Sequence, residues 1–268
     1  MIITLIKKIT VISLFFYMPF KSNAWGVLGH RIVGQIAESY LTPSAKKEIQ
    51  KILGTETIGM AANWADFIKS DSTMSYLSPW HYIDIKGGLS HADVISYLKN
   101  DTATDAYPKL NFLIKELKNK NLLPDKKRMY LRLIIHIVGD IHQPLHVGHP
   151  EDKGGNDIKV TWFGSVTNLH SVWDSRLIDF QQLSYTEYTN AINHSTKSQR
   201  VAWQKQPLAE WIYQTYQIAQ NVYNDIKPDD KLGYVYNYKY IDILNRQLLI
   251  GGIHLAALLN EIFATKGK

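Results

Sequence analysis

Apolar residues recur three and four positions apart along most of the chain, which is the spacing of one face of an α-helix. The pattern predicts helices over residues 30–40, 44–53, 91–99, 106–118, 127–141, 208–225 and 240–263. Thr42-Pro43 and Pro124-Asp125 are typical helix starts, because proline suits the first helical position. Only residues 157–166 indicate strand, with β-branched and aromatic residues around Gly164. The predicted fold is mainly α, a single-domain helical bundle with a small β-hairpin.

The first residues have the features of a secretory leader. Lys7 and Lys8 precede an apolar run over residues 9–20, and Ser22-Asn23-Ala24 supplies small residues before a cleavage point. A membrane anchor is the alternative, but a run this short cannot span a bilayer. We expect a signal peptide over residues 1–24, export to a periplasm or the medium, and no membrane span after its removal. The mature chain, residues 25–268, would begin at Trp25.

Charge and cysteine content exclude some classes of protein. The formal net charge is +6, and the leader contributes three lysines and no acidic residue, so the mature chain carries +3. This mild bias favours a polyanionic substrate but is far from the dense basic stripe of a protein that holds nucleic acid by its backbone. The chain has no cysteine, so it has no disulfides. No stable protein partner is implied.

The segment "LRLIIHIVGDIHQPLHVG" carries the strongest chemical signal. On a helix, His136 and Asp140 share a narrow stripe with the apolar Met129 and Leu133, since the spacings are four, three and four. A buried carboxylate without a partner costs several kcal/mol. We therefore expect positive charge against Asp140.

The alternative is an ordinary His–Asp hydrogen bond in the core, and further residues weaken it. Pro144 should end or kink the helix near Gln143 and turn His146 back toward the same region. His170 and Asp174 repeat the four-residue spacing, after an Asn168 that can cap their helix. "NWADFIK" and "PWHYID" add one Asp and one His among apolar residues. The candidate ligands are Asp66, His81, His136, Asp140, His146, His170 and Asp174.

Imidazole and carboxylate groups without thiolate suit zinc, while manganese and iron stay open by ligand type. Seven ligands exceed the needs of one tetrahedral ion, so two or more ions are implied, with Asp140 as a natural bridge. Clusters of this kind activate water and stabilise both oxygens in phosphoryl transfer. The predicted reaction is metal-assisted hydrolysis of a phosphate ester.

With these residues the sequence resembles a known family, the secreted single-strand-specific zinc nucleases of the S-one/P-one type, which share their fold with bacterial zinc phospholipase C. The matching motifs occur in family order over nearly the whole mature chain: "WGVLGHRIVGQIAE", "NWADFIK", "WHYID", "HIVGDIHQPLHVG", "GGNDIKV", "NLHSVWDS" and "QLLIGGIHLAALLNEIF".

The resemblance implies three Zn²⁺ ions per chain. One would be held by Asp66, His81, His136 and Asp140, and a second by His146, His170 and Asp174. The third would be held by His30, Asp140, and the free amino group and carbonyl oxygen of Trp25. An α-amino group can do this because its pKa of about 7.7–8.0 lets it lose a proton to a metal.

The resemblance also implies roles in catalysis and substrate binding. Water between the zinc ions bridged by Asp140 would attack phosphorus, with Asp66 and Asp140 among the catalytic residues. Lys69 and Asn156 match phosphate-contacting positions, although Lys69 alone could equally be a solvated surface charge. Tyr82 and Asp84 match the positions that stack on a base and hydrogen-bond it, and a stacked base is worth roughly 1–3 kcal/mol. The alternative for Tyr82 is ordinary core packing.

The remaining histidines, His91, His142, His149, His194 and His254, are assigned to packing, supporting or surface roles. Of these, His142 lies closest to the cluster in sequence and is a candidate for orienting a ligand.

The predicted function is a zinc-dependent endonuclease that cleaves single-stranded DNA and RNA to 5′-phosphorylated products and also hydrolyses 3′-nucleotides. The alternatives are a phospholipase C-like phosphodiesterase on the same scaffold and a non-enzymatic exported zinc-binding protein. "WHYID" and "GGN" favour the nuclease over the lipase.

Overall fold

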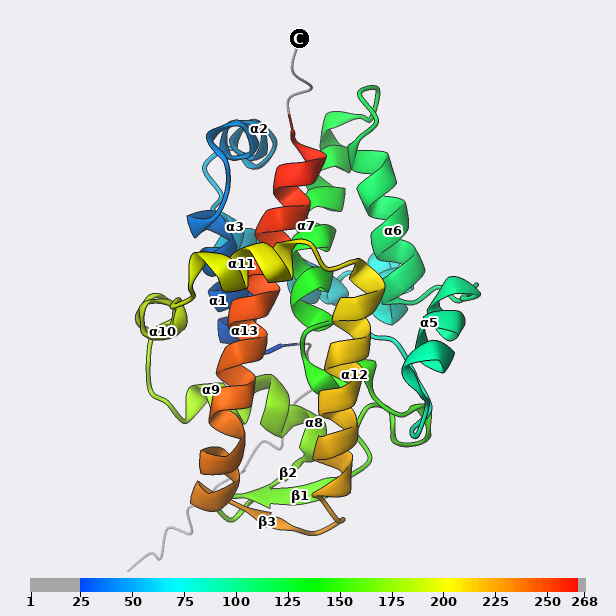
Figure 1. Ribbon diagram of the computed structural model, residues 1–268, viewed down its shortest axis with the longest axis vertical. Helices are drawn as coiled ribbons and strands as arrows, with labels where there is room; N and C mark the ends of the chain where they lie inside the picture. Colours follow the sequence, from blue (N-terminus) through cyan, green and yellow to red (C-terminus); the bar gives the residue numbers. More distant parts are fainter. Residues whose placement is uncertain (1–24, 265–268) are drawn as a thin grey trace, which may run out of the picture.

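The computed structural model describes residues 25–264, and it is mainly helical, as the sequence predicts. The longest helix, α13 (Tyr234–Ile262), follows the long axis of the molecule (Figure 1). Helices α1 (Val27–Ser39) and α7 (Pro124–Asp140) pack on it. One cluster of buried apolar side chains extends from Trp25 to Ile262. The predicted leader, residues 1–24, lies outside the described residues.

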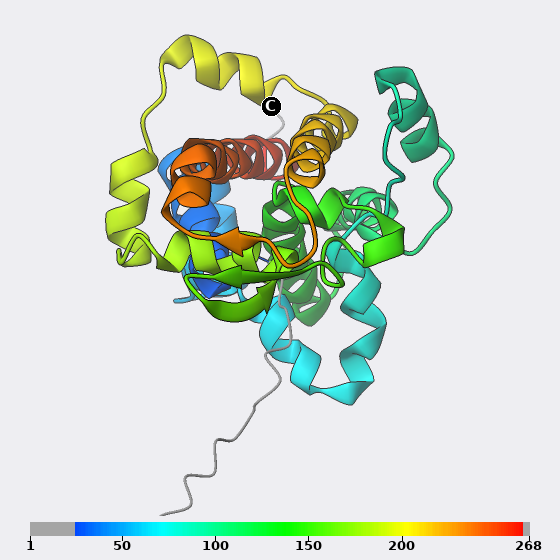
Figure 2. The ribbon, with the colours of Figure 1, turned by 90° about the horizontal axis from the view of Figure 1, so that it is seen from below.

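Shorter helices surround this core. They are α2 (Pro43–Leu53), α3 (Ile58–Ala61), α4 (Trp64–Phe67), α5 (His91–Lys99), α6 (Ala106–Leu117), α8 (Leu169–Ser171), α9 (Leu177–Asp179), α10 (Tyr185–Ile192), α11 (Lys197–Gln204) and α12 (Leu208–Asn224). The 3₁₀ segments are η1 (Ile68–Ser70), η2 (Ser72–His81), η3 (Pro144–Val147) and η4 (Pro150–Asp152). Seen from below, the cyan segment that contains η1 and η2 projects from one side of the bundle (Figure 2).

Side-chain caps explain several helix starts. The Thr42 side chain accepts a hydrogen bond from the Ala45 N–H at 3.2 Å, and Pro43 follows at the first helical position of α2. Helices α10 and α11, which the apolar periodicity did not predict, begin with capping boxes at Ser184 and Thr196. Helix α11 has no buried residue. A short polar helix gives no apolar stripe, so only its capping box could have revealed it.

The predicted hairpin is present, within a slightly larger sheet. Strands β1 (Lys159–Trp162) and β2 (Ser165–Asn168) pair antiparallel, with Trp162 opposite Ser165. A third strand, β3 (Lys231–Leu232), pairs parallel with β1 and gives the order β2-β1-β3. Strand β3 was not predicted, because two residues are too few to show the alternation of a strand.

Two helix boundaries differ clearly from the prediction. Helix α13 begins at Tyr234 rather than at residue 240, because Tyr234, Val235 and Tyr238 are exposed and hide the apolar stripe. The helix that carries His170 is also irregular, since α8 continues into a π-helical turn, η5 (Val172–Arg176), before α9. A π turn is common at functional sites.

Helix α7 ends at Asp140, three residues before Gln143, where the sequence analysis expected the break. Its C-terminal half is almost entirely buried. The chain then turns through η3, which starts at Pro144 and carries His146. The proline thus returns the backbone toward the end of α7, as predicted.

Helix α13 is long and apolar enough to cross a membrane, by length and composition alone. In this fold, however, 67% of the apolar 18-residue stretch of α13 is buried inside the protein. It packs on α1, α7 and α11. Helix α13 is therefore the central core helix of the bundle.

The N-terminus of α6 carries a carboxyl group with a shifted pKa. Asp105, 8% exposed, caps the helix by accepting a hydrogen bond from the Tyr107 N–H at 3.0 Å. Burial and the neighbouring Asp101 carboxylate raise the pKa of Asp105 to about 7 from 3.8. The folded state therefore binds this proton more tightly than the unfolded chain. The stability from this group is complete below about pH 4 and is lost as pH rises toward 7.

We expect Asp105→Asn to raise the melting temperature above wild type by about 2–4 °C at pH 8, and by less at pH 5. Asparagine keeps the helix cap, since it caps as well as aspartate, but cannot ionise. Thermal melts of both proteins at the two pH values would test this. An equal difference at both pH values would show that Asp105 is not protonated in the fold.

Candidate metal centre

All the predicted His and Asp ligands meet in one buried cluster, although they come from distant parts of the chain. His30 lies on α1, Asp66 on α4, and His81 at the end of η2. His136 and Asp140 lie on α7, His146 on η3, and His170 and Asp174 on the α8–η5 helix. Three groups have ligand atoms within 4.8 Å of one another: His30/Asp66/His136, His81/His136/Asp140 and His146/His170/Asp174.

The two carboxylate oxygens of Asp140 face different histidines. Oδ2 lies 3.0 Å from His81 Nδ1 and 3.1 Å from His136 Nε2. Oδ1 lies 3.2 Å from His30 Nε2. The side chain of Asp140 has no exposed surface. A carboxylate that presents its oxygens in two directions has the arrangement needed to link two cations.

Three of the candidate histidines are oriented by backbone carbonyl groups. The Nδ1 atoms of His136, His146 and His170 lie 2.6, 2.7 and 2.6 Å from the carbonyl oxygens of Ala62, His81 and Gly154, respectively. A carbonyl oxygen can only accept, so each Nδ1 donates a hydrogen bond, which leaves Nε2 as the ring atom that can bind a metal. This is the usual arrangement of metal-binding histidines.

The loop that orients His170 depends on a glycine. Gly154 has φ +63°, and a Cβ at this position would lie 2.4 Å from the Leu145 carbonyl oxygen. A larger residue would therefore displace the carbonyl group that holds His170 Nδ1.

Several ligand atoms make no hydrogen bond with any residue in the range 25–264, although they are buried. They are His30 Nδ1 and Nε2, Asp66 Oδ2, His81 Nε2, Asp140 Oδ1 and His146 Nε2. Each unsatisfied buried polar atom costs about 1–3 kcal/mol. So many in one cluster, all of types that bind cations, fit a multinuclear metal site.

Trp25 and Gly26, where the mature chain is predicted to begin, lie against this cluster. Trp25 has no exposed surface, and the Gly26 N–H donates to the Asp174 carbonyl oxygen at 2.7 Å. The Trp25 ring and the His30 ring both lie against Gly139 of α7, where a Cβ would be 2.7 Å from His30 Nδ1. The predicted role of the Trp25 amino group stays a prediction.

Electrostatic interactions within the cluster are strong. Burial alone would raise the pKa of Asp140, but His136, His146 and His30 hold it well below its usual range. Burial lowers the pKa of His81 to about 4. Burial opposes the charged form of His146 too, yet Asp140 and Asp174 raise its pKa to about 9. The carboxylates therefore favour positive charge in the cluster.

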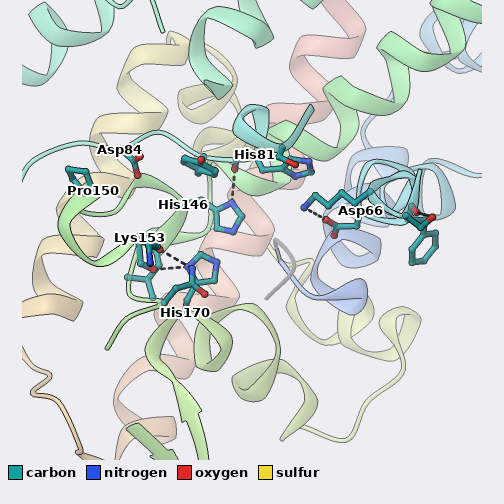
Figure 3. Close-up of a pocket in the computed structure, with 15 residues that line it drawn as sticks. Asp66, His81, Asp84, His146, Pro150, Lys153 and His170 are labelled. Carbon is teal, nitrogen blue, oxygen red and sulfur yellow. Dashed lines mark hydrogen bonds and ion pairs between the residues drawn. The ribbon is translucent and has the colours of Figure 1, made fainter. Parts of the chain in front are cut away.

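A pocket of about 690 Å³ opens onto the cluster, and the predicted substrate-binding residues line it. Lys69 lies beside Asp66, with its Nζ 2.8 Å from Oδ1. Tyr82 is 40% exposed, and Asp84 and Asn156 complete the predicted set. Figure 3 shows Asp66 and Asp84 on opposite sides of the His146 ring. The pocket thus has two ends with the ligand histidines between them.

Two supporting residues were not predicted from the sequence. Gln143 is buried and donates from Nε2 to Asp174 Oδ1 at 2.5 Å, which links the end of α7 to the second Asp. Lys153 lines the pocket and adds a second cation to it. A buried amide beside Pro144 was the available signal for Gln143, whereas Lys153 looked like any surface lysine.

The expectation that His142 orients a ligand is wrong. Its Nδ1 lies 2.7 Å from the Val138 carbonyl oxygen, and its Nε2 lies 2.8 Å from His254 Nδ1. The His254 ring in turn stacks on Trp211. His142 therefore points into the interface of α7 with α12 and α13, away from the cluster.

Comparison with known proteins agrees with this geometry. Residues 25–264 match the S1/P1 Nuclease family. The chain belongs to this nuclease family. Endonuclease 4 of Arabidopsis thaliana is 30% identical over 91% of this chain and 91% of its own length. Nuclease S1 of Aspergillus oryzae is 33% identical over 57% of this chain and 54% of its own length, and Nuclease P1 of Penicillium citrinum is 26% identical over 90% and 99%.

The protein is accordingly a nuclease, a hydrolase that acts on phosphodiester bonds of nucleic acid. Its buried His and Asp groups fit the three-metal centre that the resemblance to the S1/P1 nucleases implies.

We expect Gly139→Ala to lower metal content and stability. Inside a helix, alanine normally stabilises the protein by about 0.5–1 kcal/mol relative to glycine. Here, however, the added Cβ would meet the buried ring of His30, which stacks on the His136 ring with 3.8 Å between the ring centroids. Overpacking of this kind costs about 1–3 kcal/mol. Metal analysis and thermal melts of the purified variant would measure both effects.

Gly251→Ala is the matched control, because its Cβ would meet the ring of His142 at 3.2 Å, outside the metal centre. This variant should keep its full metal content. If Gly139→Ala also keeps its full metal content, the close approach of Gly139 to His30 does not matter for the centre.

Proposed function

We propose that this S1/P1 nuclease is an exported zinc-dependent endonuclease that hydrolyses single-stranded DNA and RNA to 5′-phosphorylated products, with 3′-nucleotidase activity. One observation supports it above all: a chain of this family buries a cluster of His and Asp atoms that lack hydrogen-bond partners among the described residues, at the base of an open pocket.

We propose three Zn²⁺ ions as the metals, because the ligand set is imidazole and carboxylate without thiolate. Asp66, His81, His136 and Asp140 would hold one ion, and His146, His170 and Asp174 a second. Trp25, His30 and Asp140 would hold the third. The bound ions would supply Lewis-acid stabilisation of the phosphate and activation of water.

The side chains of the pocket have complementary tasks in this proposal. Lys69 places a cation beside Asp66, where it can meet a phosphate oxygen, and Asn156 offers an amide donor. Tyr82 offers an exposed ring for a base. Asp84 forms no ion pair with any described residue. Partial burial and two nearby carboxylates, Asp152 and Glu151, raise its pKa. Its oxygens can accept hydrogen bonds from the donor edge of a base.

The two alternatives can be separated from this proposal. A phospholipase C-like enzyme would hydrolyse phosphatidylcholine, and an exported zinc-storage protein would hydrolyse neither lipid nor nucleic acid. Nuclease family membership speaks against both alternatives. Turnover of single-stranded DNA, RNA, a 3′-nucleotide and phosphatidylcholine by the purified mature protein tests the choice, and hydrolysis of the lipid alone would refute the nuclease.

We expect Asp140→Asn to lower the rate of single-stranded DNA hydrolysis by at least about 100-fold, since loss of even an outer partner of a metal ligand costs about 10–100-fold. Most of the helicity should remain, because the other ligands stay in place. Asp125→Asn is the control, as Asp125 is exposed in the first turn of the same helix. Activity of Asp140→Asn near wild type would refute a bridging carboxylate.

We also propose that residues 1–24 are a signal peptide, that residues 25–268 form the nuclease domain, and that the mature chain has no membrane span. The cut after Ala24 would expose the amino group of Trp25, and the neighbouring Gly26 N–H donates to the carbonyl oxygen of the ligand Asp174, which supports this role. Export and completion of the third zinc site would then depend on the same cleavage.

We expect a mature chain with one additional residue before Trp25 to bind about two zinc ions rather than three, and to lose most of its activity. Metal counting on this chain and on one that begins at Trp25 would measure the difference. Three zinc ions and full activity in the extended chain would show that Trp25 is only a core aromatic residue.

A further inference from the structure

The pocket lining includes an exposed aromatic residue next in sequence to Asp66, which lies on the opposite side of the His146 ring from Asp84 (Figure 3). Phe67, the last residue of α4, lines the pocket together with Lys69 and is 56% exposed. Phe67 is in ring contact with no other aromatic residue in the described part of the chain. Phe67 therefore adds exposed apolar surface to the lining of the pocket.

The surroundings of Phe67 are polar rather than apolar. Lys69, two residues further along the chain, lines the same pocket, as do Ser70 and Ser78. The Ser70 hydroxyl donates to the Phe67 carbonyl oxygen at 2.8 Å, which fixes the turn. A flat ring beside a cation and hydroxyl groups suits a nucleobase next to its phosphate better than it suits an acyl chain.

We propose that Phe67 is a second base-stacking residue, which binds the nucleotide on the other side of the scissile phosphate from the base held by Tyr82. This inference rests on the proposed function. Two platforms on opposite sides of the metal centre require two adjacent bases that are not stacked on each other. Phe67 thus determines specificity, favouring an unpaired dinucleotide step over a single nucleotide or a duplex.

The test compares a dinucleotide, thymidylyl-(3′→5′)-thymidine, with thymidine 3′-monophosphate, which has one base and cannot reach both platforms. We expect Phe67→Ala to lower kcat/KM for the dinucleotide by about 5- to 50-fold. Hydrolysis of the mononucleotide should stay within about twofold of wild type.

Two further variants separate stacking from apolar contact. Phe67→Trp keeps a flat ring and should retain dinucleotide activity, whereas Phe67→Leu keeps apolar bulk without a ring face and should behave like Phe67→Ala. Tyr76→Ala is the matched control, because Tyr76 is 51% exposed on the neighbouring η2 but contacts Trp80 and does not line the pocket. Tyr76→Ala should leave the hydrolysis of both substrates unchanged.

The outcomes distinguish failure of the Phe67 role from failure of the proposed nuclease function. If the wild-type protein hydrolyses neither substrate, the proposed function is wrong and this inference with it. If the wild-type protein is active but Phe67→Ala leaves kcat/KM for the dinucleotide unchanged, or lowers kcat/KM equally for both substrates, only the role of Phe67 is refuted. Full activity of Phe67→Leu on the dinucleotide would likewise refute stacking.

Discussion

The charge of one buried carboxylate constrains the rest of this structure. Asp140 has no exposed side-chain surface, and its oxygens lie 3.0–3.2 Å from nitrogen atoms of three histidines. A carboxylate in such a place is tolerated only where positive charge faces it. The fold brings ring nitrogen atoms of His30, His81 and His136 from three separate segments against this carboxylate, and Asp140 and Asp174 raise the pKa of His146 to about 9, which supplies positive charge beside it. Several buried nitrogen and oxygen atoms of the cluster nevertheless make no hydrogen bond with any residue between 25 and 264.

The same demand explains the architecture around the cluster. Helices α1 and α7 approach closely at Gly139, where there is no room for a methyl group beside His30. The chain after α7 turns at Pro144 and brings His146 back onto the cluster. The η2 segment ends at His81, whose carbonyl group orients His146. Asp66, His81, His146 and His170 line the pocket, whereas His30, His136, Asp140 and Asp174 lie behind them in the buried part of the cluster.

Much of this could be predicted from the sequence, because the relevant signals are local. Long helices with an apolar stripe, the break at Pro144 and the His136–Asp140 spacing each depend on a few neighbouring residues. The short polar helix α11, the two-residue strand β3 and the early start of α13 were missed, since burial in them is slight or interrupted. The opposite directions of the Asp140 oxygens, the link from Gln143 to Asp174 and the place of Phe67 in the pocket arise only when distant segments meet. No spacing along the chain encodes them.

The carbonyl groups that orient His136, His146 and His170 have a consequence for how the sequence can change. A side chain that orients a ligand can be lost by a single substitution, but a backbone carbonyl group belongs to every residue type. The supporting shell of the metal centre is therefore largely independent of residue identity, provided the local backbone path is kept. Such a centre tolerates extensive neutral drift in the surrounding sequence, in keeping with 26–33% identity to the fungal nucleases S1 and P1. Selection then acts on the shape of a few turns, such as the one at Gly154, more than on the residues that line them.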